Sequence, residues 1–431
     1  MNDTLDTNFY IFKNNNDIEF VYSGYSGLIL EYNPFIGKAI DNSEEVDSET
    51  YNYLYEDPFI KVEFPFLKDN AEVDTIEIII RNNNMQCSCC VSETINLVDN
   101  IKMDANKFYK GIIFFLSNFK HNNTINITFH EVEKVDDFYI VEKIVELINT
   151  IKKEYEDIRF IYSVMVDEEI LYSKKISNFL IKYNFEVVIN IGKNSKTNYD
   201  DLFTENITIK EISDYLPVKA AITVPYYEVD LTSLCHRLYE LGVRGFILQF
   251  PVDHEIVDIE RDKYILATNI EKLVYHFISN IGQRKLIRIE NFIDILYSIH
   301  YGSRKGPRYF PCSAGKSSYA LNIKGDIYPC RRFDGMKKSR WDDIDRAFDN
   351  DRRREFLSNH MVFTRDSGRC LECWAKYLCG GTCYYSSHKV NHNTSSISEM
   401  DCYFNRIMVE SALYIYASLK DDERAFLGNI K

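Results

Sequence analysis

Short runs of β-branched and aromatic residues alternate with longer segments in which apolar residues recur every three or four positions. Six such runs are TIEIIIR from residue 75, TINITFH from 124, IRFIYSVM from 158, FEVVINI from 185, KAAITV from 219 and RGFILQF from 244. The alternation is typical of repeated βα units, because each helix returns the chain to the same edge of the sheet and the strands then run parallel. The sequence therefore predicts an α/β fold.

The segments between the runs have the apolar period of helices that cover a sheet. One carries Phe108, Ile112, Phe115 and Phe119, and the next carries Ile140, Ile144, Leu147 and Ile151. Asp104 stands where an N-cap belongs, and Gly242 stands where a later helix should end. A further helical stretch is expected over about 268–300.

The two ends of the chain differ from this pattern. NFYIFK and IEFVYSGYSGLILEYN are apolar, tyrosine-rich runs separated by the turn-forming Asn14–Asp17, which predicts a leading hairpin. Further on, SRKGPRYFP at 303–311 interrupts the βα pattern and introduces a cysteine-dense tail. We therefore expect three parts, a leading element over 1–72, the βα units over 73–302 and a tail over 303–431.

Charge and hydropathy exclude several classes of function. Fifty-one Lys and Arg against 65 Asp and Glu give a net charge of -14, and the basic residues within 331–355 are interleaved with acidic ones. We expect no binding to nucleic acid or to an anionic membrane surface. The sequence has no signal-like start and no run approaching about 18 apolar residues, so we expect a cytoplasmic protein without a membrane span.

Cytosolic thiols stay reduced, so the 11 cysteines need a use other than disulfide bonds. Seven of them fall in the tail: Cys312, Cys330, Cys370, Cys373, Cys379, Cys383 and Cys402. A CxxC turn delivers two thiolates to one metal centre, and seven thiolates exceed what one centre takes. The tail therefore indicates two centres, one with four cysteines and one with three. The spacing alone leaves zinc and iron-sulfur clusters both open, because thiolates suit either.

The complete pattern is more specific. Twelve residues separate Cys312 from Gly325, and Gly325 begins a GxxxxC in KGDIYPC; RCLECWAKYLCGGTC then gives CxxC, x5, C, x3, C before the last cysteine. This resembles the SPASM domain, the C-terminal extension of radical SAM peptide maturases. The resemblance implies two auxiliary 4Fe-4S clusters. The outer one would be held by Cys370, Cys373, Cys379 and Cys402, and the inner one by Cys312, Cys330 and Cys383. The inner set lacks a fourth ligand, because GPRYFP at 306–311 contains no cysteine.

The same resemblance implies that the βα units form the partial (β/α)6 barrel of radical SAM enzymes. In that family the first strand leads into CxxxCxxC, whose three cysteines hold a cluster that binds S-adenosylmethionine. Here the loop reads NNNMQCSCCVSE, so Cys87 and Cys90 match the second and third ligands while Asn83 replaces the first. Cys89 is a poor substitute, because adjacent residues in extended backbone point to opposite sides.

Two further family markers are replaced. HEVE at 130–133 stands where a glycine-rich GGEP-like segment would follow strand two, and VMVDEE stands after strand three. Glycine matters at the first place because backbone without Cβ can approach a ligand closely. We therefore expect that binding of S-adenosylmethionine has been lost. His130 and Glu131, at the carboxyl end of strand two, retain the position in which barrels place their sites.

The chain is similar to a subset of SPASM proteins without CxxxCxxC, the grasp-with-spasm peptide maturases. This implies a component of ribosomally synthesised peptide (RiPP) maturation that acts on a precursor peptide, with an ATP-grasp ligase or an intact radical SAM enzyme as partner. One alternative is an active radical SAM enzyme whose cluster uses Cys87, Cys90 and an unconventional ligand. Another is a scaffold with zinc in the tail. The leading element either adds a strand to the precursor's leader or caps the barrel.

Other residues have simpler interpretations. We expect Cys235 to be a small buried apolar side chain and His236 to lie on the surface. His388 and His392 are expected on an exposed loop.

Overall fold

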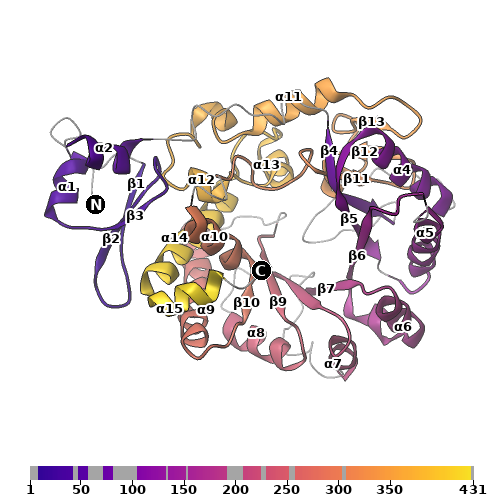
Figure 1. Ribbon diagram of the computed structural model, residues 1–431, viewed down its shortest axis with the longest axis horizontal. Coiled ribbons are helices and arrows are strands. Elements are labelled where there is room, and N and C mark those ends of the chain that lie inside the picture. Colours follow the sequence, from indigo (N-terminus) through magenta and orange to yellow (C-terminus); the bar gives the residue numbers. More distant parts are fainter. Residues whose placement is uncertain are drawn as a thin grey trace.

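The computed structural model describes residues 8–41, 47–56, 71–80, 104–132, 134–151, 154–191, 207–224, 230–251, 258–302 and 307–428. Its main sheet has ten strands in the order β10-β9-β8-β7-β6-β5-β4-β11-β12-β13. Figure 1 shows these strands as an open arc, with the helices of the βα units on its outer side. The α/β fold with a large, mostly parallel sheet is the predicted fold class.

All six predicted strands are present and each pairs parallel with its neighbour. They are β4 (Glu72–Ile79), β5 (Lys120–Val132), β6 (Arg159–Val166), β7 (Glu186–Ile191), β8 (Val218–Thr223) and β9 (Gly245–Gln249). β-Branched residues fill these strands because helices cover one face of the sheet, and their side chains pack well on a pleated surface.

The helices between the strands also follow the sequence pattern. They are α4 (Ala105–Asn118), α5 (Phe138–Ile151), the short 3-10 helix η2 (Glu168–Tyr172), α6 (Lys174–Lys182), α7 (Ile207–Ser213) and α8 (Leu231–Glu240). The Asp104 side chain caps α4 by accepting from the Asn106 N–H at 2.9 Å. Gly242 follows α8 with φ +96°, and a Cβ there would lie 1.8 Å from Ser213 Oγ, so only glycine fits.

The long helical stretch expected over about 268–300 is divided in two. α9 (Ile259–Gly282) and α10 (Glu290–Tyr301) are separated by a turn and by β10 (Arg288–Ile289), which pairs with β9. The expectation of one helical stretch is wrong. Apolar periodicity continues through Leu286 and Ile287, so the sequence pattern shows no break, but Arg284 adopts φ 58°, which is not a helical conformation.

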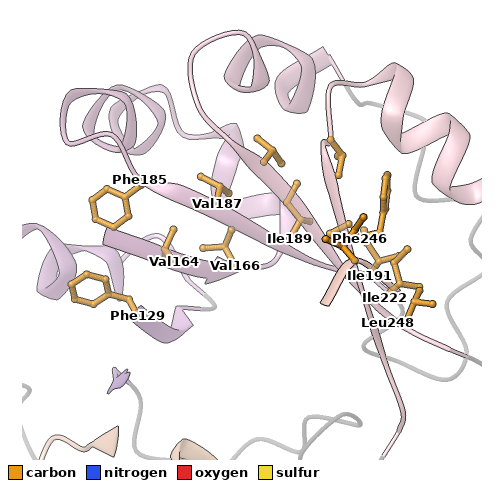
Figure 2. Packing of buried hydrophobic residues seen from close by; sticks show 14 of the residues in the cluster. Phe129, Val164, Val166, Phe185, Val187, Ile189, Ile191, Ile222, Phe246 and Leu248 are labelled. Carbon is orange, nitrogen blue, oxygen red and sulfur yellow. The ribbon is translucent and has the colours of Figure 1, made fainter. Parts of the chain in front are cut away.

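The core lies between the sheet and its helices. Figure 2 shows Phe129, Val164, Val187, Ile189 and Phe246 lying along one side of the strands, and each is fully buried. Truncating such a side chain to alanine typically costs about 2–5 kcal/mol of stability. This core fixes the position of the strand ends.

The leading element contains the predicted hairpin. Its elements are β1 (Phe9–Lys13), β2 (Glu19–Ser23), β3 (Ile29–Glu31), α1 (Pro34–Asp41) and α2 (Ser48–Tyr55), and β1 pairs antiparallel with β2. Asn14 Oδ1 accepts from the N–H groups of Asn16 and Ile18, which closes the turn. The element packs on the tail, where Tyr10 stacks on Trp374 at 4.2 Å between ring centroids.

The tail continues the main sheet. Its elements are β11 (Ser318–Leu321), β12 (Asp326–Tyr328), η5 (Arg331–Phe333), β13 (Asp342–Asp343), α11 (Asn350–His360), η6 (Arg365–Gly368), α12 (Lys376–Cys379), α13 (Tyr384–Asn391), α14 (Glu399–Ser418) and α15 (Asp421–Gly428). β11 runs parallel to β4, with Ala320 opposite Glu77. The expected boundary at 302/303 thus separates segments that share one sheet, and the division into three parts remains a prediction.

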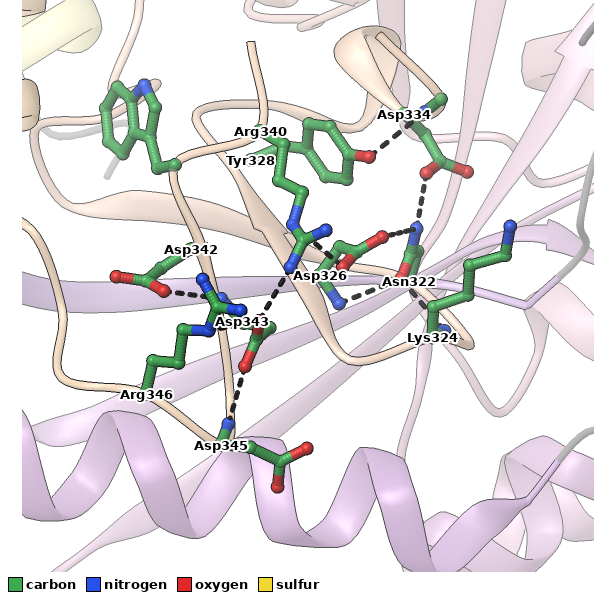
Figure 3. A network of polar contacts seen from close by, with 12 residues as sticks. Asn322, Lys324, Asp326, Tyr328, Asp334, Arg340, Asp342, Asp343, Asp345 and Arg346 are labelled. Atoms are coloured by element: carbon green, nitrogen blue, oxygen red, sulfur yellow. Dashed lines mark hydrogen bonds and ion pairs between the residues drawn. The ribbon is translucent and has the colours of Figure 1, made fainter. Parts of the chain in front are cut away.

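The glycine of the GxxxxC pattern has a structural reason. Gly325 turns the chain between β11 and β12 with φ +84°, and an added Cβ would lie 3.0 Å from Ile344. The hairpin is fixed by polar contacts shown in Figure 3: Asn322 Nδ2 donates to Asp334 at 2.7 Å, and Arg340 pairs with Asp326 at 3.0 Å. The turn and its network therefore set where β12 delivers Cys330. In the described part of the chain, no helix is long and apolar enough to span a membrane.

Candidate metal centres

Four of the tail cysteines line one pocket of about 510 Å³. We call them the outer group: Cys370, Cys373, Cys379 and Cys402. Cys370 and Cys373 lie in the turn before α12, Cys379 ends α12, and Cys402 lies in the first turn of α14. Trp374 and Phe9 form an apolar wall of this pocket. Arg369 and Arg406 also line it and add positive charge. The structure thus brings together the four residues expected at the outer centre.

Two glycines allow the backbone to wrap this pocket. Gly380 ends α12 with φ +73°, and a Cβ there would lie 2.2 Å from the Phe310 carbonyl oxygen. Gly381 has φ +103°, and its Cβ would lie 2.9 Å from Arg365 Nη1. Both the positive φ and the close approach require glycine, which explains the CGGTC sequence.

Three of the outer thiols, those of Cys370, Cys379 and Cys402, are protonated near neutral pH when no cation is bound. Burial, with a smaller contribution from neighbouring cysteines, raises the pKa of Cys370 to about 11 and of Cys379 and Cys402 to about 12. Arg365 opposes the shift at Cys370, and Arg406 and Arg369 oppose it at Cys402. Because metals bind thiolates, occupation of this pocket must release protons.

The other three tail cysteines form an inner group: Cys312, Cys330 and Cys383. Cys330 lies two residues after β12, immediately before η5, and Cys383 immediately precedes α13. Arg332 bridges the two, because its backbone N–H donates to Cys330 Sγ at 3.4 Å and its Nη1 donates to Cys383 Sγ at 3.5 Å. Burial is the largest cause that raises the pKa of Cys330 well above its usual value. The negative charges of Glu77, Cys383 and Cys312 act in the same direction. Cys312 and Cys383 are thus close enough to Cys330 to influence its charge.

The surroundings of the inner group come from two parts of the chain. Cys330 and Cys383 pack against a buried cluster that contains Ile79 of β4 together with Tyr384 and Tyr385 of α13. The inner group is thus built where the tail meets the first strand of the βα units.

All four donors of the outer group are cysteine thiols, a ligand type that suits both iron-sulfur clusters and zinc. Among the described residues, no three His, Cys, Asp or Glu side chains converge on a position that one metal ion could occupy. In a cluster, each thiolate binds a different iron, so the ligands surround a larger volume. The donor set of the outer group, four thiols around a pocket wrapped by glycine backbone, fits a four-iron cluster.

The loop that carries Cys87, Cys89, Cys90 and Asn83 lies outside the described residues, and so does Glu133. The structure does describe the carboxyl end of β5, which carries His130 and Glu131. Glu131 adopts φ 62°, a conformation that favours glycine, at an irregularity in pairing between Phe129 and Val132. The backbone at the GGEP-like position therefore keeps a glycine conformation although the residue is glutamate.

His130 is buried beside this irregularity. Its Nδ1 has no hydrogen-bond partner in the described part of the chain. Burial, with help from Arg331 and Arg332, holds its pKa well below the usual value, so the imidazole is neutral. His130 lies at the carboxyl end of its strand, as expected.

Of the remaining sequence predictions, those for Cys235, His236 and His392 are confirmed and that for His388 is wrong. Cys235 is buried in the core, and His236 is exposed and pairs with Glu240 at 3.3 Å, as predicted. His392 is exposed beyond α13, but His388 lies within α13 and is half-buried, so its placement on an exposed loop is wrong. The helix extends because Tyr384 and Tyr385 anchor its first turn in a buried cluster.

Sequence reasoning missed two charged residues. Glu77 lies within the apolar run TIEIIIR, and a carboxylate inside such a strand is a signal that could have been noticed. Arg365 is fully buried and donates to hydroxyl and carbonyl oxygens of Thr382 and Ser387, between the two cysteine groups. Nothing in its sequence context marks it.

Comparison with known proteins supports the fold. No family model matches the chain, and no curated protein sequence matches it. The structure is similar to anSMEcpe with bound AdoMet and Cp18Cys peptide, with a TM-score of 0.61, 14% identity, and coverage of 83% of this chain and 100% of that chain. It is also similar to Streptococcus suis SuiB bound to precursor peptide SuiA, with a TM-score of 0.51, 13% identity, and coverage of 93% of this chain and 99% of that chain. The chain therefore has the fold of radical SAM/SPASM enzyme structures over most of its length.

Proposed function

We propose that this protein is a SPASM-type component of ribosomal peptide maturation that binds a precursor peptide and holds two 4Fe-4S clusters in its tail. The observation that carries the proposal is the partition of the seven tail cysteines into a pocket of four and a group of three. Cys370, Cys373, Cys379 and Cys402 would hold the outer cluster, and Cys312, Cys330 and Cys383 the inner one. When bound, such clusters supply one-electron transfer.

The chain's own residues prepare these sites. Gly380 and Gly381 let the backbone approach the outer cluster, and Arg369 and Arg406 offset the negative charge of four thiolates. Trp374 and Phe9 exclude water from one wall of the pocket. Low water access strengthens the attraction between thiolates and iron.

The precursor peptide is the proposed partner, because similar structures hold peptides: anSMEcpe binds Cp18Cys and SuiB binds SuiA. In the leading sheet β1 packs against the tail through Tyr10 and Trp374, whereas among the described strands β3 pairs only with β2. Leu28 and Phe35 are exposed near β3. An extended leader could therefore add a strand at β3 while β1 anchors the element.

We further propose that the arc does not cleave S-adenosylmethionine, because Asn83 replaces a cluster ligand and HEVE replaces the glycine-rich segment. The second candidate is an active radical SAM enzyme, favoured by likeness to AdoMet-bound anSMEcpe and to SuiB bound to S-adenosylmethionine. Incubation of dithionite-reduced protein with S-adenosylmethionine separates the two. Formation of 5'-deoxyadenosine above a buffer control would establish the second candidate.

Anaerobic purification tests the clusters themselves. The proposal expects a brown protein with broad absorbance near about 400 nm and about eight irons and eight sulfides per chain. A colourless protein with stoichiometric zinc would instead support the zinc scaffold and contradict the proposal.

A protein that does not cleave S-adenosylmethionine needs a second enzyme to form the bond in the precursor. An ATP-grasp ligase or an intact radical SAM enzyme would supply the bond-forming step on the bound precursor. Co-purification of this chain with a candidate ligase, dependent on the precursor peptide, would support this part of the proposal; failure of both candidates to bind would contradict it.

A further inference from the structure

The inner group has one thiol fewer than a four-iron cluster needs, and a carboxylate lies beside it. Glu77 is on β4, between the fully buried Ile76 and Ile78. Side chains alternate along a strand, so Glu77 shares a face with Ile79. Ile79 belongs to the buried cluster against which Cys330 and Cys383 pack. Glu77 therefore points to the side of the sheet on which the inner group lies.

Two contacts from the tail hold this carboxylate. Glu77 Oε2 accepts from the backbone N–H of Arg331, the residue after Cys330, at 2.9 Å. Its Oε1 accepts from Ser318 Oγ on β11 at 3.3 Å. Glu77 and Arg331 are 254 residues apart in sequence, so only the pairing of β11 with β4 brings them together. The negative charge of Glu77 acts on the thiols of both Cys312 and Cys330.

A half-buried carboxylate between apolar residues is costly unless it is compensated. The two hydrogen bonds that Glu77 accepts use part of its capacity, since a carboxylate offers about four lone-pair positions. It can therefore bind a cation without losing its present contacts.

We propose that a Glu77 carboxylate oxygen is the fourth ligand of the inner cluster and binds the iron that Cys312, Cys330 and Cys383 leave open. This inference rests on the proposed function, because it requires a cluster at the inner group. His130 is the other unassigned buried ligand near the arc's mouth, but its electrostatic neighbours are Arg331 and Arg332 rather than the cysteines. Glu77 is preferred because it contacts the residue next to Cys330.

The test compares Glu77→Gln and Glu77→Cys in the full chain, reconstituted anaerobically with iron and sulfide. Glutamine keeps an oxygen that accepts the Arg331 N–H but lacks the charge of a ligand. We expect Glu77→Gln to lose about one iron of eight and to show the electron paramagnetic resonance signal of an oxidised three-iron cluster. Glu77→Cys should restore about eight irons, with a Mössbauer spectrum of all-thiolate ligation.

Two control variants distinguish the loss of an iron ligand from the loss of a hydrogen bond that supports Glu77. Ser318→Ala removes one hydrogen bond to Glu77 and should leave the iron count unchanged. His130→Ala tests the competing ligand, and loss of one iron there but not in Glu77→Gln would overturn the proposal. Retention of about eight irons and an unchanged spectrum in Glu77→Gln would also overturn it.

The outer cluster serves as an internal reference. Its four irons should persist in every Glu77 variant, which shows that the variant has folded. Absence of iron from the wild-type chain would contradict the proposed function itself, whereas a wild-type inner cluster unaffected by Glu77 variants contradicts only this inference.

Discussion

The two cysteine groups are built in different ways. The outer cysteines all lie within residues 370–402, and the turns that carry them form most of their pocket, with Phe9 of the leading element on one wall. The inner group uses Cys312, Cys330 and Cys383 from the tail but rests on Ile79 and Glu77 of β4. A site made from one short segment can be recognised from spacing, whereas a site made where two segments meet depends on the fold. We therefore expect the outer site to respond to local changes and the inner site to respond to docking of β11 on β4.

Removal of the two outer CxxC thiols should have the largest effect. The double variant Cys370→Ala/Cys373→Ala leaves two of the proposed ligands in the outer pocket, and we expect loss of about four of eight irons while the inner irons remain. Iron and sulfide analysis with Mössbauer spectroscopy measures this. Cys235→Ala is the matched control, because that cysteine is buried in the core and should leave iron unchanged. Loss of all iron in this double variant would contradict independent sites.

Gly380 tests how the backbone wraps the outer pocket. In Gly380→Ala the new Cβ would lie 2.2 Å from the Phe310 carbonyl oxygen, so backbone must shift at a cost of about 2–4 kcal/mol. We expect more than about half of the outer iron to be lost, since the proposed ligand Cys379 precedes this residue. Gly368→Ala is the control, because Gly368 has φ +95° but no atom within 4 Å of the added Cβ. Equal iron loss in both variants would show that φ strain alone matters.

His360 makes the stability of the chain depend on pH. It stacks on Phe356 and lies 4.9 Å from the ring of Tyr384, beside the inner group. Burial lowers its pKa to about 4, against a backbone hydrogen bond to Phe356 that raises it. The unfolded chain therefore binds more protons between about pH 6.5 and pH 4, and stability falls by about 3 kcal/mol as pH falls through that range.

His360→Phe should remove this loss, so that its stability changes less than that of wild type between pH 6.5 and pH 4. Urea unfolding at several pH values measures the difference. His236→Gln is the control, because His236 is exposed and should leave the wild-type slope intact. An unchanged slope in His360→Phe would contradict the assignment.

Arg365 gives the smallest of the expected effects. It lies between the two cysteine groups. Its guanidinium is fully buried and donates to Thr382, which separates Cys379 from Cys383. Loss of this positive charge should make both clusters harder to reduce. We expect Arg365→Met to lower both potentials by on the order of 50 mV, since 59 mV is a tenfold change for one electron. Protein-film voltammetry measures this, with Arg244→Met as the control, because Arg244 is exposed just before β9 and lines neither cysteine group. A shift in only one cluster would place Arg365 with that group.

The sequence predicts the parts of the molecule that local pattern controls. The six strands and the division of seven cysteines into four and three follow from periodicity and spacing, because adjacent residues impose them. The pairing of β11 with β4 could not be predicted, since it is a contact between strands far apart in the chain. Glu77 and Arg365 were missed for the same reason: their roles come from residues that only the fold places beside them. The division of α9 from α10 was missed because apolar residues continue across the turn.

The central claim is that the tail holds two iron-sulfur clusters and that the mouth of the arc holds none. Mössbauer spectroscopy of the chain reconstituted with ⁵⁷Fe, with and without S-adenosylmethionine, tests it most directly. The account predicts about eight irons per chain and identical spectra in both samples. About twelve irons, of which one third change their spectrum on addition of S-adenosylmethionine, would contradict it.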